Sequence, residues 1–293
     1  MNRFYITDVF GFDKYTGNQL ATVICGDRLT DLEMQKIARE INFSETTFIL
    51  DETPQDNGYD IRIFTPKAEV DFAGHPVLGT AYIIQQHIIG LPVEKILLNC
   101  KVGQISISLP KPGEQNGILW MKQVEPIFGE QLLRKDLAAA LNLDIKEIDD
   151  SCPIEQVSTG IPIIIVPLKS MDALKRARID KEIYWNLIDK TWAKAILVFC
   201  PGGYQENHDL GVRVFVEFLG IPEDPATGSG AGCLAAYLVR NGYFEKDAID
   251  ITLGQGYEID RPSQLHLRCS KENDQYTIHV GGRVVPIAEG KWF

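Results

Sequence analysis

Short apolar runs separated by Gly, Pro or Asn recur along most of the chain, and this punctuation is typical of β-strands. The runs are about as long as single strands of globular proteins. Strands therefore dominate the expected fold. The predicted strands include residues 4–10, 21–25, 46–50, 61–65, 95–100, 104–109, 163–168, 195–199, 264–269 and 276–280.

Helical patterns are fewer. Thr30 followed by Glu33 forms a capping box that predicts a helix to about Glu40, and apolar spacing predicts helices over residues 129–141 and 181–190. Two further segments, 76–87 and 229–240, are apolar or small around their whole circumference. Such segments are typical of buried helices, and Asn241-Gly242 is suited to end the second of them.

An internal repeat links the two buried helices. Residues 62–64 (RIF) recur as 213–215 (RVF), Asp71-x-Ala73-x5-Gly79 recurs as Asp224-x-Ala226-x5-Gly232, and Thr16-Gly17-x5-Val23 recurs as Thr159-Gly160-x5-Val166. The three matches keep the same order at offsets of 151, 153 and 143 residues. This order predicts a duplicated domain, whereas two unrelated β-rich domains are the alternative.

The repeat divides the chain into two similar halves, residues 1–120 and 121–293. The C-terminal strand is a candidate to complete the first half. Each half is expected to wrap many strands around one apolar helix, and the two halves are expected to join within residues 110–130. This segment is rich in helix and strand breakers, namely Pro110, Pro112, Gly113, Gly117 and Pro126.

Charge and composition limit the classes of binding partner that the protein can have. The 293 residues carry 29 Lys and Arg against 40 Asp and Glu, a formal net charge of −11, so nucleic acid is excluded as a general partner. The N-terminus lacks the apolar core of a signal peptide, and no run approaches the roughly 18 apolar residues of a membrane span. These features predict a cytoplasmic protein without a membrane partner.

The six cysteines are scattered and form no C-x-x-C pair, which predicts free thiols and no zinc site. The five histidines show no metal-ligand spacing either. We therefore expect neither a metal ion nor an organic cofactor.

Each buried helix is entered through a Gly-containing turn, 71–76 (DFAGHP) in the first half and 224–230 (DPATGSG) in the second. Free N–H groups and the positive dipole end make a helix start a site for an anion. If the duplicated halves face each other, both helix starts point into one cleft that suits a small carboxylate. The alternative is a pair of tight connections in which Asp, Thr and Ser merely cap.

Two side chains beside the first turn are candidates for proton transfer. His75 stands immediately before Pro76 at the helix start and titrates near neutral pH when unperturbed. Glu45 lies between Phe43 and Phe48, apolar surroundings that raise a carboxyl pKa toward the range useful for catalysis. A structural histidine and a solvated turn glutamate are the alternatives.

Four longer motifs give the chain a family resemblance. Residues 16–23 (TGNQLATV), 42–48 (NFSETTF), 64–76 (FTPKAEVDFAGHP) and 220–229 (GIPEDPATGS) resemble the PhzF-like phenazine biosynthesis isomerases of the diaminopimelate epimerase-like superfamily. The resemblance covers essentially the whole chain, including 158–162 (STGIP), 255–256 (QG), 261–263 (RPS) and 280–283 (VGGR). It implies an α+β fold with two pseudo-symmetric halves, each a β-barrel-like sheet around a central helix.

The resemblance also implies roles for particular residues. Glu45 takes the place of the family's proton-shuttling acid/base, and His75 and Asp224 take the places of groups that hold and polarise the substrate. The binding residues implied are Asn18, Gly74, Thr227, Gly228 and Ser229. A small carboxylate substrate and a homodimer are further implications.

Three departures bear on mechanism and specificity. Related racemases use one cysteine at each helix start, whereas Ala73 and Ala226 stand here and the nearest thiol, Cys233, falls one turn inside the helix. A two-thiol mechanism is therefore disfavoured. Val216-Glu217 and Asp260 stand where the family commonly has Ala-Pro and Gly.

The resulting hypothesis is a cofactor-free isomerase that moves a proton between carbons of a small cyclic or unsaturated amino or hydroxy acid. An epimerase or dehydratase acting on a proline-like acid is the alternative within enzymes. A relative that binds a small carboxylate without turning it over is the alternative outside them.

Overall fold

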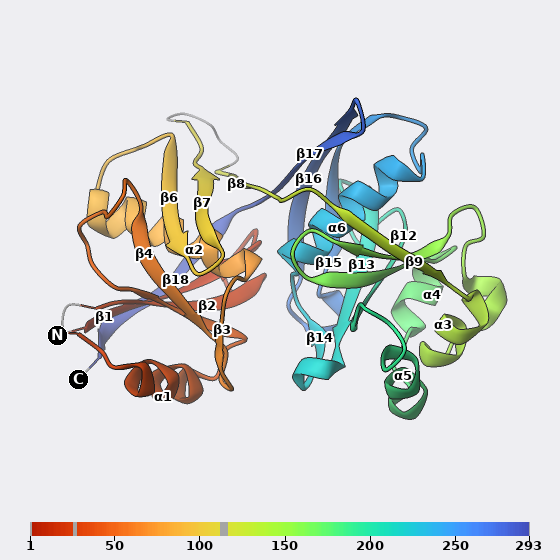
Figure 1. Cartoon of the computed structure of the whole chain (residues 1–293), viewed down its shortest axis with the longest axis horizontal. Coiled ribbons are helices and arrows are strands. Elements are labelled where there is room, and N and C mark those ends of the chain that lie inside the picture. Colours follow the sequence, from red (N-terminus) through yellow and green to blue (C-terminus); the bar gives the residue numbers. More distant parts are fainter. Residues whose placement is uncertain (1, 26–27, 112–116, 293) are drawn as a thin grey trace. The chain divides into compact units, whose positions relative to one another are not determined.

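The computed structural model describes residues 2–25, 28–111 and 117–292 (Figure 1). The chain forms two compact units. The first unit comprises residues 1–122 and 281–293, and the second comprises residues 123–280. Pro112 and Gly113 of the expected junction lie outside the described residues.

The first unit is a strongly curved sheet around one helix. Helix α2 (Gly74–Ile83) contacts strands on every side, and it continues as the π-helical turn η1 (Ile84–Ile89). Helix α1 (Asp31–Ile41) covers the outer face of the sheet, where Met34 and Ile37 pack against Phe48 and Phe64. The strands are β1 (Asn2–Val9), β2 (Asn18–Ile24), β3 (Glu45–Ile49), β4 (Tyr59–Phe64), β5 (Glu69–Val70), β6 (Lys95–Cys100), β7 (Gly103–Ser108), β8 (Leu119–Lys122) and β18 (Val284–Trp292).

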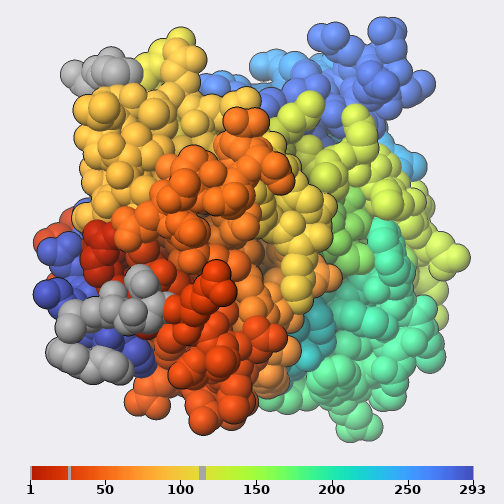
Figure 2. All heavy atoms as spheres, turned by 60° about the vertical axis from the view of Figure 1, so that its left-hand side comes forward, coloured from red at the N-terminus to blue at the C-terminus, as the bar shows by residue number. Residues whose placement is uncertain are grey.

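The last strand of the chain completes the first unit. Strand β18 pairs antiparallel with β1, from Asn2 opposite Trp292 to Val9 opposite Val284. Figure 2 shows the consequence on this face, where the blue C-terminal segment lies beside the red N-terminal segment. The sheet is thereby closed by residues almost 300 positions apart in the sequence.

The second unit has the same plan around helix α6 (Gly228–Arg240), which contacts β10, β11, β15 and β16. Short helices α3 (Arg134–Ala140), α4 (Met171–Arg176) and α5 (Lys181–Ile188) and the 3-10 turns η2 (Ile145–Glu147), η3 (Glu217–Leu219) and η4 (Tyr257–Ile259) join its strands. The strands are β9 (Ile127–Leu132), β10 (Ile154–Ser158), β11 (Pro162–Pro167), β12 (Ala195–Pro201), β13 (Leu210–Val216), β14 (Ile221–Asp224), β15 (Ala248–Gln255), β16 (Ser263–Glu272) and β17 (Gln275–Gly282).

The repeat seen in the sequence is present in the pairing of the strands. In the first unit β1 is antiparallel to β2, β2 parallel to β3, β3 antiparallel to β4 and β4 parallel to β6. Strands β10, β11, β12, β13 and β15 repeat this order and these directions in the second unit. The duplicated fold predicted from the sequence is therefore confirmed at the level of topology.

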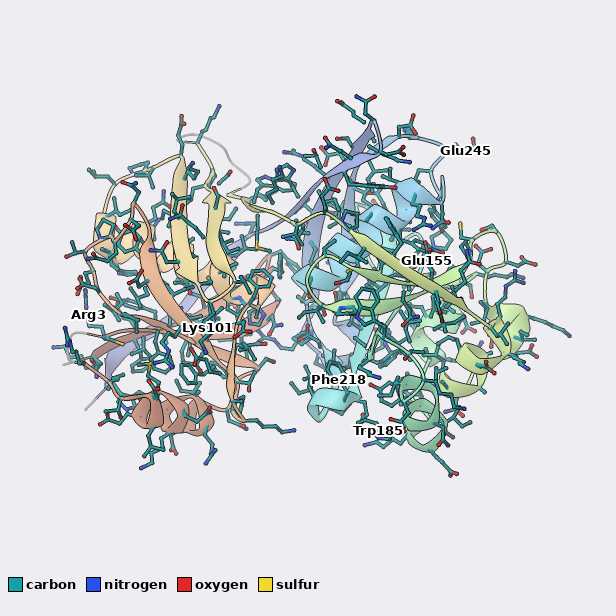
Figure 3. All side chains as sticks on the ribbon, viewed as in Figure 1. Arg3, Lys101, Glu155, Trp185, Phe218 and Glu245 are labelled. Atoms are coloured by element: carbon teal, nitrogen blue, oxygen red, sulfur yellow. The ribbon has the colours of Figure 1, made fainter. Side chains whose placement is uncertain are left out.

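The repeated Arg-x-Phe motif makes the same ion pair in both units. Arg62 on β4 makes a bidentate ion pair with Glu69, and Arg213 on β13 makes the same pair with Glu223. Each guanidinium also lies over the ring of the Phe two residues later, at 5.1 Å and 4.9 Å. Such pairs hold the short strand that leads into the central helix. Lys101, labelled in Figure 3, adds a further contact of 2.7 Å to Glu69.

The secondary structure differs from the prediction in one segment and at the start of one helix. The helix expected over residues 129–141 begins only at Arg134, because residues 127–132 form β9 and pair with β10. The first buried helix starts at Gly74 rather than Pro76. The capping box is confirmed, since Thr30 Oγ1 accepts from the Glu33 N–H at 3.3 Å and Glu33 Oε2 accepts from the Thr30 N–H at 2.7 Å.

The helices of the described segments include none that is both long enough and apolar enough to cross a membrane.

Candidate active site

The start of α2 is an uncapped helix N-terminus. The N-cap residue Ala73 has an extended backbone with φ of −151°, and its side chain offers no oxygen to the helix. Gly74, His75 and Pro76 form the first turn, and all three are buried. This turn therefore offers the N–H groups of Gly74 and His75 to an anionic group of a ligand, since Pro76 has none.

Strand β3 brings Glu45 to this helix start. Glu45 is the first residue of β3 and lies opposite Leu20 of the parallel strand β2. Its Oε2 atom is 3.5 Å from Nε2 of His75, and the two side chains are only 18% and 6% exposed. Two candidates separated by 30 residues in the sequence thus form one pair, and Glu45 is not a solvated turn residue.

Burial keeps the His75 imidazole neutral. It lowers the pKa of His75 to about 3, and a hydrogen bond to the main chain of Gln19 opposes this effect only in part. Because Nε2 is the atom that faces Glu45 and makes no hydrogen bond within the described residues, the bond to Gln19 falls to Nδ1. The neutral ring therefore carries its proton on Nδ1 and presents the Nε2 lone pair toward the carboxyl group.

Asn18 and Gly74 belong to the same region of the first unit. Asn18 begins β2 one residue before Gln19, is buried, and lies opposite Val9 of β1. The turn before it needs Gly17, whose φ is +77° and where a Cβ would lie 2.4 Å from the Val9 carbonyl oxygen. The conformation of Gly17 therefore sets where Asn18 begins β2, and the motif at residues 16–23 contains both residues.

The remaining candidates lie in the second unit, at the start of α6. Asp224 ends β14, and its Oδ2 accepts a hydrogen bond of 2.5 Å from the Thr227 hydroxyl. Thr227 is the N-cap residue, but it makes no side-chain bond to the helix. Gly228 and Ser229 form the first turn and are buried. This helix start is therefore uncapped, as that of α2 is.

Gln255 holds the turn between Asp224 and Thr227, a role that sequence reasoning did not assign. Its Nε2 donates to the Asp224 carbonyl at 2.8 Å and to Thr227 Oγ1 at 3.1 Å, while its Oε1 accepts from the Thr227 N–H at 3.3 Å. The available signal was the Gln255-Gly256 pair. Gly256 has a φ of +79°, and a Cβ there would lie 2.6 Å from the Pro225 carbonyl oxygen.

The departures at Val216-Glu217 and Asp260 are also located in the second unit. Glu217 begins η3 and pairs with Lys181 at 2.6 Å. Asp260 adopts the left-handed conformation with φ of 56°, which an Asp tolerates better than most residues other than Gly.

No thiol occupies either helix start. Ala73 and Ala226 fill the two positions, and Cys233 lies within α6, fully buried beside Thr159 Oγ1 at 3.6 Å. Burial raises the pKa of Cys233 to about 11, so this thiol is a poor base at neutral pH. In the part of the chain that the structure describes, no cluster of three or more His, Cys, Asp or Glu residues could hold a metal ion.

Comparison with known proteins places the chain in a family. The family model described as "Phenazine biosynthesis-like protein" (PhzC-PhzF) matches residues 7–290. The chain belongs to this family. It is 35% identical to a trans-2,3-dihydro-3-hydroxyanthranilate isomerase of Pseudomonas fluorescens, over 99% of both chains. The chain is therefore an enzyme of the isomerase class.

Solved structures agree with this assignment. A phenazine biosynthesis protein of the PhzF family from Bacillus anthracis superposes with a TM-score of 0.90 at 26% identity, covering 100% of this chain and 99% of that one. A probable proline racemase from Agrobacterium radiobacter superposes with a TM-score of 0.66 at 10% identity, covering 100% and 93%. The second likeness concerns the fold alone, and together they confirm the predicted epimerase-like fold.

Proposed function

We propose that this isomerase transfers a proton between carbons of a small cyclic or unsaturated amino or hydroxy carboxylic acid by general acid/base catalysis. The name of the Pseudomonas fluorescens relative makes trans-2,3-dihydro-3-hydroxyanthranilate the first compound to test. Glu45 is the group that carries the proton. His75 and Asp224 hold and polarise the substrate.

The pair formed by Glu45 and His75 supports this proposal most directly. The carboxyl group lies 3.5 Å from a neutral imidazole at an uncapped helix start. A carboxyl group and a ring nitrogen at this separation tighten into hydrogen-bond distance when a substrate orders the site. The same helix start offers free N–H groups to a substrate carboxylate.

The proton balance needs no other reactant. The Glu45 carboxylate removes a proton from a carbon of the substrate, so a C–H bond breaks and an O–H bond forms while the electron pair enters the conjugated system. The Nε2 lone pair of His75 accepts a hydrogen bond from the resulting carboxylic acid. Return of the proton to a second carbon breaks the O–H bond and completes the isomerisation.

The turn held by Gln255 has a complementary role in the proposal. The Thr227 hydroxyl donates to the Asp224 carboxylate, so that carboxylate is oriented before any ligand arrives. The free N–H groups of Gly228 and Ser229 suit a second anionic or polar group of the substrate. That both helix starts act on the same ligand remains a prediction from the internal repeat.

Replacement of Glu45 by Gln tests the assignment of the base. The amide keeps the size of the side chain but cannot accept a proton, so turnover should fall by at least about 10²-fold while ligand binding changes little. Turnover of trans-2,3-dihydro-3-hydroxyanthranilate and deuterium incorporation from D₂O are measured by NMR. Glu40→Gln, an exposed change on α1, is the control and should keep the wild-type rate.

The same assay separates the alternatives. An unchanged rate of deuterium incorporation in Glu45→Gln would move the role of base to Asp224. Exchange at one carbon without net conversion would indicate reversible enolisation, and exchange with inversion of configuration at that carbon would indicate an epimerase. Binding of small carboxylates with neither exchange nor conversion would indicate a binding protein. His75→Ala and Asp224→Asn should weaken both binding and turnover, because both residues are proposed to contact the substrate.

A further inference from the structure

Three threonine hydroxyls form a buried hydrogen-bonded row across β2, β3 and α2, two of which carry Glu45 and His75. Thr80 Oγ1 of α2 donates to Thr47 Oγ1 of β3 at 2.8 Å, and Thr47 Oγ1 donates to Thr22 Oγ1 of β2 at 3.0 Å. All three side chains are fully buried. We call Thr22, Thr47 and Thr80 the threonine ladder.

The ladder connects the two elements that carry the catalytic pair. Thr47 follows Glu45 by two residues on β3, about 6.6 Å along the strand and on the same face of the sheet. Thr80 follows His75 by five residues on α2, about 7.5 Å along the helix axis. Both contacts, Glu45–His75 and Thr47–Thr80, join β3 to α2.

A valine would fill each of these positions at a lower cost of desolvation, because a buried hydroxyl must be hydrogen-bonded to offset its loss of water. The hydroxyls add directional hydrogen bonds to the packing of α2 on β3. A hydrogen bond of 2.8 Å tolerates only a narrow range of distance and angle, and so it restrains the height and rotation of α2 relative to β3. The separation of His75 from Glu45 depends on that alignment.

We infer that Thr47 and Thr80 are positioning residues that hold His75 at Glu45 through the alignment of α2 and β3. The inference rests on the proposed role of that pair. Neither threonine contacts the reacting groups in the described structure, so their effect should fall on the geometry of the pair and not on recognition of the substrate. A displacement of about 1 Å in such a pair can cost about 10²-fold in rate.

The chain offers a matched control on the adjacent residue. Thr46 is as fully buried as Thr47 and lies on the same strand, but the alternation of the strand turns it toward the side of Phe48 and α1. Its Oγ1 makes no hydrogen bond within the described residues. Thr46→Val and Thr47→Val therefore make the same chemical change, and only the second breaks the ladder.

The experiment compares these two variants by kinetics and by ¹⁵N NMR of the histidine side chains. Thr47→Val should lower kcat by about 10- to 100-fold with KM changed less than about twofold, and it should shift the Nε2 resonance of His75, which is assigned from its loss in His75→Gln. Thr46→Val should change neither. Thr47→Ser restores the hydroxyl and should recover most of the activity and the wild-type resonance.

The readouts keep the two proposals apart. If the wild-type protein does not convert trans-2,3-dihydro-3-hydroxyanthranilate, the proposed substrate fails, and the His75 resonance still tests the ladder. Thr80→Val removes the first donor alone and replaces Thr47→Val if that variant does not fold. Equal resonances in wild type and Thr47→Val, or equal effects of Thr46→Val and Thr47→Val, would overturn the inference.

Discussion

His75 shows how burial determines the chemistry of a single residue. The ring is buried at the helix start, and the main chain of Gln19 occupies one of its nitrogens. A histidine exposed to water is partly protonated at neutral pH, but this one is held neutral. A ring in this state can act near Glu45 as a hydrogen-bond acceptor at Nε2 but not as a cation.

This neutrality predicts a pH dependence of stability. Between pH 6.5 and about 3 the unfolded chain binds a proton at residue 75 that the folded chain does not, so the free energy of unfolding rises with pH in that window and levels off above it. One proton gives a slope of at most about 1.4 kcal/mol per pH unit. His75→Gln should remove this contribution in urea unfolding measured from pH 4 to 8.

A histidine elsewhere provides the control. His279→Gln changes a half-buried residue on β17 and leaves His75 in place, so the slope should persist. An unchanged slope in His75→Gln would mean that the acid sensitivity of the fold arises elsewhere.

Among the helices and strands, the end of β15 holds the turn that leads into α6. Strand β15 ends at Gln255, whose side chain makes three hydrogen bonds to the turn between β14 and α6. These bonds fix the turn before α6 without capping the helix, and they leave its first N–H groups for a ligand. In the first unit Ala73 reaches the same result by lacking any polar side-chain atom.

Gln255→Leu should lower both stability and catalytic efficiency. Loss of the amide removes the three hydrogen bonds that hold this half-buried turn, which costs about 1–3 kcal/mol, and it loosens the turn that carries Asp224. We expect a fall in kcat/KM of at least about tenfold, measured with the substrate assay at a temperature where the variant remains folded.

Gln156→Leu separates the two effects. Gln156 is also buried in the second unit, where it accepts from the Ala193 N–H at 2.8 Å. Its loss should reduce stability by a similar amount with kcat/KM unchanged. Equal losses of kcat/KM in both variants would reduce the role of Gln255 to general stability.

Across the whole molecule, the two units share a fold but differ at the position of the proposed base. Strand registers match Glu45, opposite Leu20, with Ala195, opposite Ile163. The repeat aligns these positions, so the second unit carries an alanine where the first carries the proposed base. The duplication has thus kept the topology, while only the first copy carries the proposed acid/base. The homodimer implied by the family resemblance remains a prediction.

A single acid/base predicts partial return of the abstracted hydrogen. With substrate deuterated at the carbon that loses its proton, some product formed in H₂O should carry deuterium at the carbon that gains one, because one carboxyl group serves both steps. Mass spectrometry of product from a single turnover measures this fraction. Complete loss of the label, even in the earliest product, would favour two separate groups.

Features that depend only on neighbouring residues could be predicted from the amino-acid sequence. The capping box at Thr30, the two apolar helices expected over residues 76–87 and 229–240 and the left-handed Gly242 after α6 all follow from local backbone and burial preferences, although the helices begin slightly earlier, at Gly74 and Gly228. The internal repeat also predicted the duplicated fold, because each copy of the pattern encodes the same local elements. The family motifs identified the candidate residues but not their contacts.

Features that depend on residues far apart in the chain arise only in the folded molecule. Residues 129–132 have helical spacing but form a strand, because pairing with β10 outweighs a weak local preference. The contact of His75 with Glu45, the neutral state of that ring, the threonine ladder and the bonds of Gln255 join segments separated by about 25 residues or more. Such contacts arise only when the sheet curls around its helix, because burial and distance are properties of the packed chain and not of any local sequence.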